Sequence, residues 1–356
     1  MAAPVRRAGT PGRHMAMQPL SVGVLGGSGF TGLELLRCLS RHPGVRVAFA
    51  TTRQPDAVAT RRFPGPWCTP EEARVYTVDW VFSCLPHGES APWVAEWVDR
   101  GARVIDLSGD FRFPTPELYT AWYGMSHRCP ERLAEAALVL PEWNASMARD
   151  RRLIANPGCY PTAVWLAVLP LVRAGLIETY PIVVDAKSGV TGAGRTPTER
   201  THFVSVQENF TVYSAGRRHR HVGEIEHYLE AWTGTSGRVL FTAGLLPVRR
   251  GLMVTVYAAL RDGATARTVG SCLAESYAGR PFVRVRPLGE VPALGDVVGT
   301  NRCDIGVVEA DDTGWVVLVA VLDNLLKGAG GQAVQTMNLL MGWDETLGLP
   351  VEGGDG

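Results

Sequence analysis

The chain of 356 residues is long enough for two domains of ordinary size. Its 35 Lys and Arg residues balance 35 Asp and Glu residues, so no net charge favours nucleic acid or an anionic membrane as a partner. Hydrophobic residues make up 46% of the chain and charged residues 20%, which excludes a mainly disordered protein. We expect a globular protein whose partners are small molecules.

The cysteines and the N-terminus bear on the compartment. Seven widely spaced cysteines include no C-x-x-C pair, so we predict neither a metal site nor a redox dithiol, and a reducing cytoplasm fits best. No stretch has the roughly 18 uncharged apolar residues that span a membrane. Residues 1–17 lack the apolar core of a secretory signal, and we interpret them as a disordered start rather than a transit-like segment.

The hydrophobic pattern predicts an α/β protein built from two sheets. In the first part, strands alternate with helices, which indicates a Rossmann doubly wound parallel sheet. Strands are expected at 21–25, 45–50, 80–84 and 104–107, and helices at 33–41 and 91–100. In the second part, a helix at 161–174 and strands at 182–186, 239–242, 252–259, 282–286 and 315–321 predict an α+β domain with a mixed sheet. A last helix at 330–341 is expected to pack on the first domain.

A glycine pattern, Gly27-x-Gly29-x-x-Gly32, lies between the first strand and the first helix. A dinucleotide fingerprint requires this context, because glycines let the backbone approach a pyrophosphate and the helix N-terminus offers free N–H groups. An ordinary tight turn is the alternative. We predict cofactor contacts along the whole loop, from Gly27, Ser28, Gly29, Phe30, Thr31 and Gly32.

The end of the second strand indicates which nicotinamide cofactor is used. An NAD site places Asp or Glu there, to accept hydrogen bonds from the ribose hydroxyls. This chain has Thr52 and Arg53 instead, and these side chains are suited to a 2′-phosphate. We therefore predict NADP(H), with a solvated Arg53 as the alternative.

A cysteine follows a sharp turn in the segment Ala-Asn-Pro-Gly-Cys-Tyr-Pro-Thr at 155–162. A thiol at a helix N-terminus meets the positive end of the helix dipole, which lowers its pKa and favours the nucleophilic thiolate. The neighbouring amides are suited to an oxyanion. Cys159 is therefore our candidate nucleophile.

A basic segment supplies the candidate acid and base. His219 and His221 lie among three arginines at 217–220, with Glu224 one helical turn beyond His221. This spacing would let Glu224 hold the His221 imidazole in one tautomer. The alternative is a basic loop before an ordinary helix.

Two polar loops look like ligand loops. The first, at 106–112, follows a strand at the edge where open α/β sheets bind ligands, and contains Ser108 and Arg112. The second, at 187–195, contains Ser188, Gly189 and Arg195, and its amides are suited to an anion. We predict substrate contacts for Ser108, Arg112 and Arg195 and cofactor contacts for Ser188 and Gly189.

Together these motifs resemble the N-acetyl-γ-glutamyl-phosphate reductase family of arginine biosynthesis, within the glyceraldehyde-phosphate and aspartate-semialdehyde dehydrogenase-like superfamily. The matching segments include Gly-Gly-Ser-Gly-Phe-Thr-Gly at 26–32, Leu-Pro-His-Gly at 85–88, Asp-Leu-Ser-Gly-Asp-Phe-Arg at 106–112 and the cysteine segment at 155–162. Others are Ser-Gly-Val-Thr-Gly-Ala-Gly-Arg at 188–195, His-Arg-His at 219–221, Cys-Asp-Ile-Gly at 303–306 and the segment at 323–333. The resemblance covers residues 21–349.

The resemblance implies roles for these residues. Cys159 would be the nucleophile and His221 the acid and base, oriented by Glu224. His219 and Arg112 would contact the carboxylate or acetamido end of the substrate. Which histidine transfers the proton stays open, with His221 preferred because it begins the helix. Asn324 would bind the nicotinamide carboxamide, and Pro86 would also lie at the cofactor.

The implied reaction is the NADPH-dependent reduction of an acyl phosphate through a cysteine thioester. We expect 18–158 to form the NADP-binding domain, completed by 325–356, and 159–324 to form a catalytic and dimerisation domain of a homodimer or homotetramer. The alternatives are a reductase of aminoadipyl or carrier-linked phosphate in lysine or specialised biosynthesis, an aspartate-semialdehyde dehydrogenase and a non-catalytic NADPH sensor. One departure from the family pattern is Gly223, which replaces a common proline before Glu224.

Overall fold

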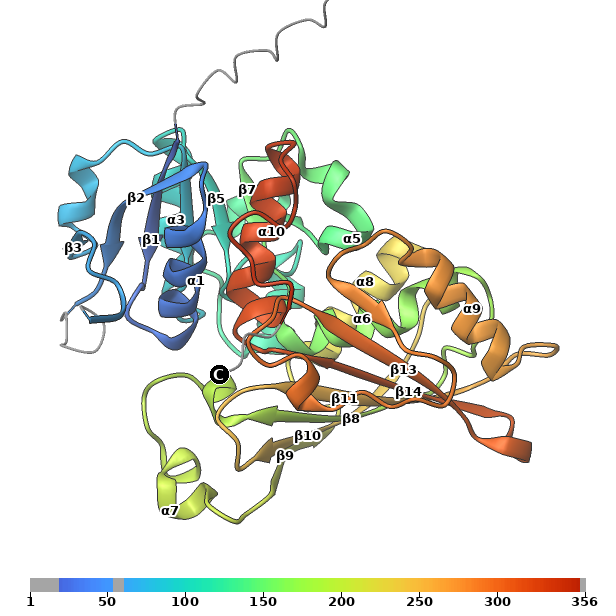
Figure 1. Ribbon diagram of the computed structural model, residues 1–356. Coiled ribbons are helices and arrows are strands. Elements are labelled where there is room, and N and C mark those ends of the chain that lie inside the picture. The colour runs from blue at the N-terminus through green and yellow to red at the C-terminus, as the bar shows by residue number, and fades with distance from the viewer. Residues whose placement is uncertain (1–18, 54–60, 353–356) are drawn as a thin grey trace, which may run out of the picture.

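A computed structural model describes residues 19–53 and 61–352. Two sheets lie one above the other in Figure 1, each with helices packed against it. The expectation for residues 1–17 falls outside the described residues. The predicted fold class, a Rossmann doubly wound sheet plus a second mixed sheet, is confirmed.

The first sheet is parallel, with seven strands in the order β3-β2-β1-β4-β5-β7-β6. Its strands are β1 (Leu20–Leu25), β2 (Val45–Thr51), β3 (Trp67–Cys68), β4 (Trp80–Ser83), β5 (Arg103–Asp106), β6 (Ala137–Leu138) and β7 (Leu153–Ala155). The strand order reverses between β1 and β4. In open α/β sheets, ligands bind beyond the carboxyl ends of the strands at such a switch point.

Helices cover both faces of the first sheet. They are α1 (Phe30–Arg41), α3 (Ser90–Asp99) and the C-terminal α10 (Gly331–Leu340). Val22 of β1 shares a core with Leu36 of α1 and Val334 of α10. Val81 of β4 belongs to a different core, which contains Val94 of α3. Alternate side chains of a strand point to opposite faces, so the two cores lie on either side of the sheet. The C-terminal helix therefore packs on the first domain, as predicted.

The second sheet has seven strands in the order β12-β13-β14-β11-β8-β10-β9, and its pairs are both parallel and antiparallel. Its strands are β8 (Ile182–Gly189), β9 (Thr211–Gly216), β10 (Val239–Leu246), β11 (Leu252–Ala259), β12 (Val283–Val285), β13 (Cys303–Glu309) and β14 (Trp315–Leu322). The helices α6 (Cys159–Arg173), α8 (His221–Thr233) and α9 (Ala266–Ser276) pack on one side of it (Figure 1). Buried and partly exposed side chains alternate along β11, so the face of the sheet without helices is partly exposed.

Short helices complete the chain. They are α4 (Pro116–Tyr123), α5 (Pro141–Asn144), α7 (Phe203–Val206), the 3₁₀ helices η1 (Glu72–Val75), η2 (Pro130–Glu135), η3 (Ala145–Ala148), η4 (Val190–Ala193), η5 (Glu199–Thr201), η6 (Leu294–Asp296) and η7 (Asp311–Thr313), and the π-helix η8 (Leu326–Gly330). The π-helix leads directly into α10. Among the described residues, no helix is both long and apolar enough to cross a membrane.

Candidate active site

The glycine loop between β1 and α1 has the close packing that only glycine allows. Gly26 has φ +70°, a conformation that other residues rarely adopt. A Cβ on Gly32 would lie 2.5 Å from the Gly26 carbonyl oxygen, so the helix approaches the turn closely. The end of β2 holds the same turn, because Thr51 accepts hydrogen bonds from Gly26 N at its Oγ1 (3.0 Å) and from Gly27 N at its carbonyl oxygen (2.9 Å).

The start of α1 leaves room for an anion. Its N-cap, Gly29, makes no side-chain capping bond, and a Cβ there would meet only the Gly26 carbonyl oxygen, at 3.7 Å. Phe30 and Thr31 begin the helix, so their amides belong to the first, unpaired turn. Thr52 Oγ1 donates to Ser28 Oγ (3.0 Å), which brings the end of β2 to this loop. These residues fit the pyrophosphate and ribose of a dinucleotide.

Arg53 lies at the mouth of this loop. Its side chain is 84% exposed and forms an ion pair with Glu89, with Nη2 and Oε2 2.9 Å apart. Glu89 belongs to the turn after β4, where its N–H donates to the carbonyl oxygen of Pro86 (3.2 Å). Arg53 and Pro86 therefore follow β2 and β4, the two strands that flank β1 and its glycine loop.

Cys159 is the first residue of α6, as the sequence predicted. The preceding Gly158 has no side chain to cap the helix, and its N–H donates to Glu224 Oε1 (2.8 Å). A Cβ on Gly158 would lie 2.6 Å from His221 Nε2 and 2.9 Å from Arg112 Nη1. The turn before Cys159 therefore brings α6, α8 and the loop after β5 together, and only glycine fits at its centre.

A buried cluster surrounds this turn. Arg112 donates from Nε to the carbonyl oxygen of Asn156 (3.0 Å) and from Nη1 to Glu224 Oε2 (3.4 Å). The same Nη1 lies 3.5 Å from His221 Nε2. Arginine can only donate, so this contact favours the tautomer with its lone pair on Nε2. His221 Nδ1 is buried and has no hydrogen-bond partner among the described residues.

The position of Glu224 corrects one expectation. Its two carboxylate oxygens accept from Gly158 and Arg112, and no hydrogen bond of the described residues joins Glu224 to His221. His221 and Glu224 both lie in the first turn of α8. They do not pair, because the Gly158 N–H binds the Glu224 carboxylate instead. Glu224 therefore orients the cysteine turn rather than the imidazole.

The ionisation of Cys159 corrects a second expectation. Burial raises the pKa of the Cys159 thiol above its ordinary value and outweighs Arg112 and the Tyr160 N–H, which lower it. Burial and the neighbouring His219, Arg112 and Arg220 hold the pKa of His221 well below its ordinary value. The prediction of a lowered thiol pKa is therefore wrong, and the site pairs a neutral thiol with a neutral imidazole at pH 7.

His219 packs beside His221, with ring centroids 4.7 Å apart. Its Nδ1 accepts from the backbone N–H of His221 (3.2 Å), and burial lowers its pKa to about 4. Tyr160, next to the cysteine, packs edge-on against both imidazoles. His219 is therefore uncharged at neutral pH and lines the site beside His221.

Ser108 and Arg195 lie in different surroundings from those expected of substrate contacts. Ser108 is buried, and its Oγ donates to Asp106 Oδ2 (2.6 Å) and accepts from Asp110 N (3.0 Å). Burial, with Asp110 nearby, raises the pKa of Asp106 to about 6. Arg195 Nη1 donates to the carbonyl oxygen of Ser28 (2.7 Å), in the glycine loop. Ser108 thus supports its own loop, and Arg195 contacts the predicted cofactor loop.

Ser188, Gly189 and Asn324 are brought together at the end of the second sheet. Asn324 accepts at Oδ1 from Gly251 N (2.8 Å) and donates from Nδ2 to Thr191 Oγ1 (3.0 Å). A Cβ on Gly189 would lie 2.8 Å from Arg250 N, so this strand end is tightly packed. Asn324 is 4% exposed, and both ends of its amide bond to protein.

The structure adds residues that sequence reasoning missed. Tyr213 of the edge strand β9 reaches the site, where its hydroxyl lies 3.3 Å from that of Tyr160. Asp110 accepts from Gly88 N (2.6 Å) and Ala91 N (2.9 Å) and so fixes the turn that contains Pro86. The strand β9 is short and lies at the edge of its sheet, so its sequence did not single out Tyr213. Asp110 lies within the loop at 106–112, which the sequence had indicated as a ligand loop.

The described residues form no metal-binding cluster, and a surface hollow lies apart from the predicted site. No group of three or more His, Cys, Asp or Glu side chains in the described ranges is arranged to hold a metal ion. A surface hollow of about 490 Å³ lies beside α7 and contains none of the predicted site residues. Its lining residues are Thr198, Glu199, Arg200, Ser205, Asn209 and Thr211.

Comparison with known proteins places both halves of the chain in known families. Residues 21–150 match the family model "Semialdehyde dehydrogenase, NAD binding domain", and residues 159–324 match "Semialdehyde dehydrogenase, dimerisation domain". N-acetyl-gamma-glutamyl-phosphate reductases from Magnetococcus marinus and Geobacillus kaustophilus are each 42% identical to this chain. These alignments cover 93% of this chain and 97% and 98% of the two relatives.

Solved structures share the fold at lower sequence identity. Aspartate semialdehyde dehydrogenase II from Vibrio cholerae, complexed with ASA, has a TM-score of 0.70 and is 20% identical, over 91% of this chain and 98% of that chain. Aspartate semialdehyde dehydrogenase with NADP from Candida albicans has a TM-score of 0.66 and is 15% identical, over 91% and 99% of the two chains. At these identities the likeness concerns the fold alone.

Proposed function

The chain belongs to the N-acetyl-γ-glutamyl-phosphate reductase family, and from that premise we propose that it reduces N-acetyl-γ-glutamyl phosphate to N-acetylglutamate semialdehyde. In this proposal NADPH is the reductant, Cys159 forms a thioester, and the reaction serves arginine biosynthesis. The observation that carries the proposal is the turn at Gly158, where the cysteine, the His221 imidazole and a buried Arg112–Glu224 pair meet.

The first half of the reaction needs a thiolate. Because the Cys159 pKa is raised and the His221 pKa is lowered, both groups are neutral before reaction. His221 Nε2 faces the cysteine turn with its lone pair and accepts the thiol proton as the sulfur attacks the γ-acyl carbon. The C–O bond to phosphate breaks, phosphate leaves with the electron pair, and a thioester remains.

The second half reduces the thioester. The glycine loop and Asn324 would hold a nicotinamide cofactor, which would supply a hydride to the thioester carbonyl carbon. The amides at the start of α6, including the Tyr160 N–H that bonds the sulfur, stabilise the negative oxygen that results. His221 returns its proton, the C–S bond breaks, and Cys159 is regenerated as the semialdehyde leaves.

The choice of NADPH rests on the residues at the end of β2. No carboxylate occupies positions 50–53, and Arg53 is exposed beside the glycine loop. A 2′-phosphate would replace Glu89 as the partner of Arg53. Because the phosphate is doubly charged, Arg53 would form charge-assisted hydrogen bonds with it. We expect a marked preference for NADPH over NADH.

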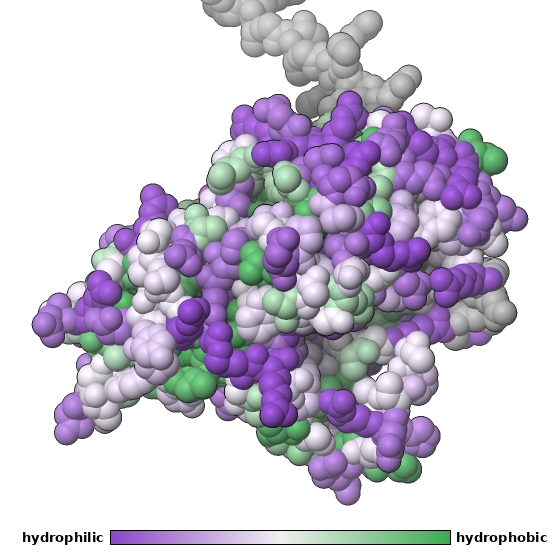
Figure 2. Space-filling view, turned by 180° about the vertical axis from the view of Figure 1, so that it is seen from behind, coloured by the Kyte–Doolittle hydropathy of each residue, from purple (hydrophilic) through white to green (hydrophobic). Residues whose placement is uncertain are grey.

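The homo-oligomer and the compartment are part of the same proposal. The side of the second sheet without helices exposes Leu240 (48%) and Tyr257 (38%), and a second copy would cover them. Figure 2 shows hydrophobic atoms among hydrophilic ones on the lower half of the molecule, over this sheet. All seven cysteines are free, which fits a reducing cytoplasm.

The activity is tested in the reverse direction with purified protein. We expect phosphate-dependent reduction of NADP⁺ with N-acetylglutamate semialdehyde, and a much lower kcat/KM with the homologue that is one methylene longer. Cys159→Ser is expected to lower kcat by at least about 10³-fold, as is typical for a removed nucleophile, with NADPH affinity unchanged within a few-fold. A serine variant that keeps more than about a hundredth of the wild-type rate would contradict covalent catalysis.

A further inference from the structure

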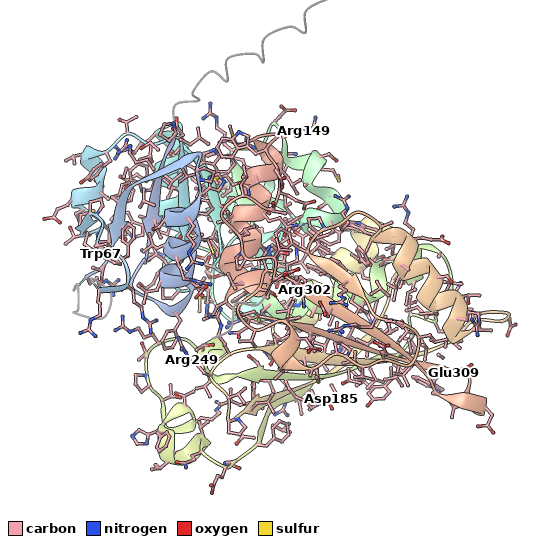
Figure 3. All side chains as sticks on the ribbon, in the orientation of Figure 1. Trp67, Arg149, Asp185, Arg249, Arg302 and Glu309 are labelled. Atoms are coloured by element: carbon pink, nitrogen blue, oxygen red, sulfur yellow. The ribbon has the colours of Figure 1, made fainter. Side chains whose placement is uncertain are left out.

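We propose that Arg250 is a positioning residue that couples the glycine-loop helix α1 to the strand end carrying Ser188, and thereby sets the geometry of hydride transfer. This inference rests on the proposed function. Arg250 lies in the turn between β10 and β11 of the second sheet, outside the cysteine cluster. In Figure 3 the neighbouring Arg249 lies where this turn approaches the lower end of α1.

Arg250 joins two carboxylates from different parts of the fold. Its Nη1 lies 3.2 Å from Glu34 Oε2 on α1. Its Nε lies 2.7 Å from Asp323 Oδ2, and its Nη2 donates to Asp323 Oδ1 (2.8 Å). The side chains of Arg250, Glu34 and Asp323 are only 14%, 11% and 0% exposed, so these pairs are weakly screened by solvent.

Asp323 is itself fixed at the end of β14. Its Oδ2 accepts from Gly299 N (2.8 Å), and its Oδ1 accepts from Leu325 N (2.9 Å). The next residue is Asn324, the predicted contact of the nicotinamide carboxamide. The Arg250 guanidinium therefore contacts Asp323, the residue before Asn324, and also contacts Glu34 of α1.

The backbone of the same turn holds the strand end that carries the predicted cofactor contacts Ser188 and Gly189. Gly189 N donates to Gly251 O (2.9 Å), Val190 N to Val248 O (2.9 Å) and Thr191 N to Arg249 O (3.1 Å). Gly251 N in turn donates to Asn324 Oδ1 (2.8 Å). Hydrogen bonds thus join the segment 189–191, Asn324 and the turn that carries Arg250 into one unit.

Arg250 adds a charged contact between this unit and the first domain to the packing of η8 on α1. The N-terminus of α1 would hold the pyrophosphate, and the unit around Asn324 would hold the nicotinamide, so the distance between them decides where the ring lies. The Glu34–Arg250 pair crosses from one to the other, and Arg195 makes a separate contact with the Ser28 carbonyl oxygen. Loss of the Glu34–Arg250 pair would leave Cys159 chemistry intact but misplace the ring, and a displacement of about 1 Å is enough to slow a reaction by about 10²-fold.

Glu34→Gln is the mild test, because it removes the ion pairs of Glu34 with Arg250 and with Arg37 of the same helix, while the Arg250–Asp323 pair remains. Two half-reactions are measured by stopped flow with enzyme in excess: phosphate release from N-acetyl-γ-glutamyl phosphate without cofactor, and NADPH oxidation by the preformed acyl-enzyme. We expect phosphate release within about 2-fold of wild type and NADPH oxidation slowed by at least about 10-fold. Arg250→Gln should act in the same direction and more strongly.

The matched control is Glu178→Gln. It removes the exposed Arg261–Glu178 pair, whose side chains are 45% and 50% exposed, and should leave both rates within about 2-fold of wild type. The inference is overturned if Glu34→Gln leaves NADPH oxidation unchanged, or if it slows both half-reactions equally, as a purely structural role would. If wild type itself gives neither half-reaction, the proposed function fails and the inference falls with it.

Discussion

Two neutral groups, rather than a preformed ion pair, define the reacting centre at the scale of single residues. A helix N-terminus favours a thiolate, and the sequence reasoning relied on that effect. In the folded protein the desolvation of Cys159 is larger, and His221 is desolvated as well. In the proposed mechanism, the thiol therefore transfers its proton to His221 when the substrate is in place.

This ionisation state predicts the pH dependence of alkylation at Cys159. A thiol whose pKa is raised reacts only through the small thiolate fraction, so its rate should keep rising with pH beyond the ordinary pKa of a free thiol. We expect iodoacetamide to modify Cys159 more slowly at pH 7 than it modifies free cysteine, as followed by mass spectrometry of the peptide. A rate that is already level between pH 5 and 7 would instead indicate a thiolate–imidazolium pair.

At the scale of elements, the packing of α8 depends on a glycine in its first turn. Gly223 lies in the first turn of α8, and a Cβ there would lie 2.1 Å from the Trp122 ring of α4. The absence of a side chain lets α4 pack directly on the helix that carries His221 and Glu224. A proline or alanine at this position requires Trp122 to move.

Gly223→Ala is therefore expected to destabilise the protein by about 1–3 kcal/mol, because it overpacks the contact with Trp122. The matched control is Gly270→Ala in α9, where a Cβ meets nothing within 4 Å. That change should be neutral or stabilising by up to about 1 kcal/mol, since alanine favours a helix. Urea unfolding of both variants measures the difference. Equal stabilities for the two variants would show that Trp122 adjusts without cost.

The elements themselves were largely predictable from the hydrophobic pattern. The range 252–259 matches β11, and the predicted bounds of α1, α6 and α10 differ from the observed ones by only a few residues, because these helices have long apolar faces. The pattern missed β13, although Cys303–Glu309 is apolar and mostly buried, because Gly306 interrupts the run. It also missed the short edge strands β3, β6 and β9, which have too few residues for a period to be visible, and it gave no range for the helix α9.

At the scale of the whole molecule, a buried charge lies where the chain returns from the second sheet to the first domain. Lys327, in the π-helix before α10, is fully buried. Its Nζ donates to Glu142 Oε1 of α5 (2.6 Å) and to Gln335 Oε1 of α10 (2.8 Å). This network joins the C-terminal helix to the first domain and was invisible to sequence reasoning, because its members are 185 and 8 residues apart.

Lys327→Met should therefore destabilise the protein by about 3–5 kcal/mol, since it leaves the Glu142 carboxylate buried without its cation. The double variant Lys327→Met with Glu142→Leu should recover much of this loss, because no unpaired charge remains. The midpoints of urea unfolding measure the stability of the single and the double variant. A single variant that loses less than about 1 kcal/mol would mean that the carboxylate finds another partner.

The candidate site was predictable in its identity but not in its contacts. The motifs around Cys159, His221 and the glycine loop are local and could be found in sequence order. The partners of Glu224, Arg195 and Arg250 depend on which loops meet in space, and no spacing along the chain encodes that. For the same reason the sign of the Cys159 pKa shift required the folded environment, because burial decides it.

The most direct test is to capture the acyl-enzyme. Wild-type protein and Cys159→Ala are incubated with N-acetyl-γ-glutamyl phosphate without NADPH, quenched in acid and digested for mass spectrometry. We expect one N-acetylglutamyl group on the peptide that contains Cys159, removed when NADPH is added before the quench, and none on the alanine variant. Phosphate release without an acylated Cys159 peptide, or acylation of another cysteine, would contradict the mechanism.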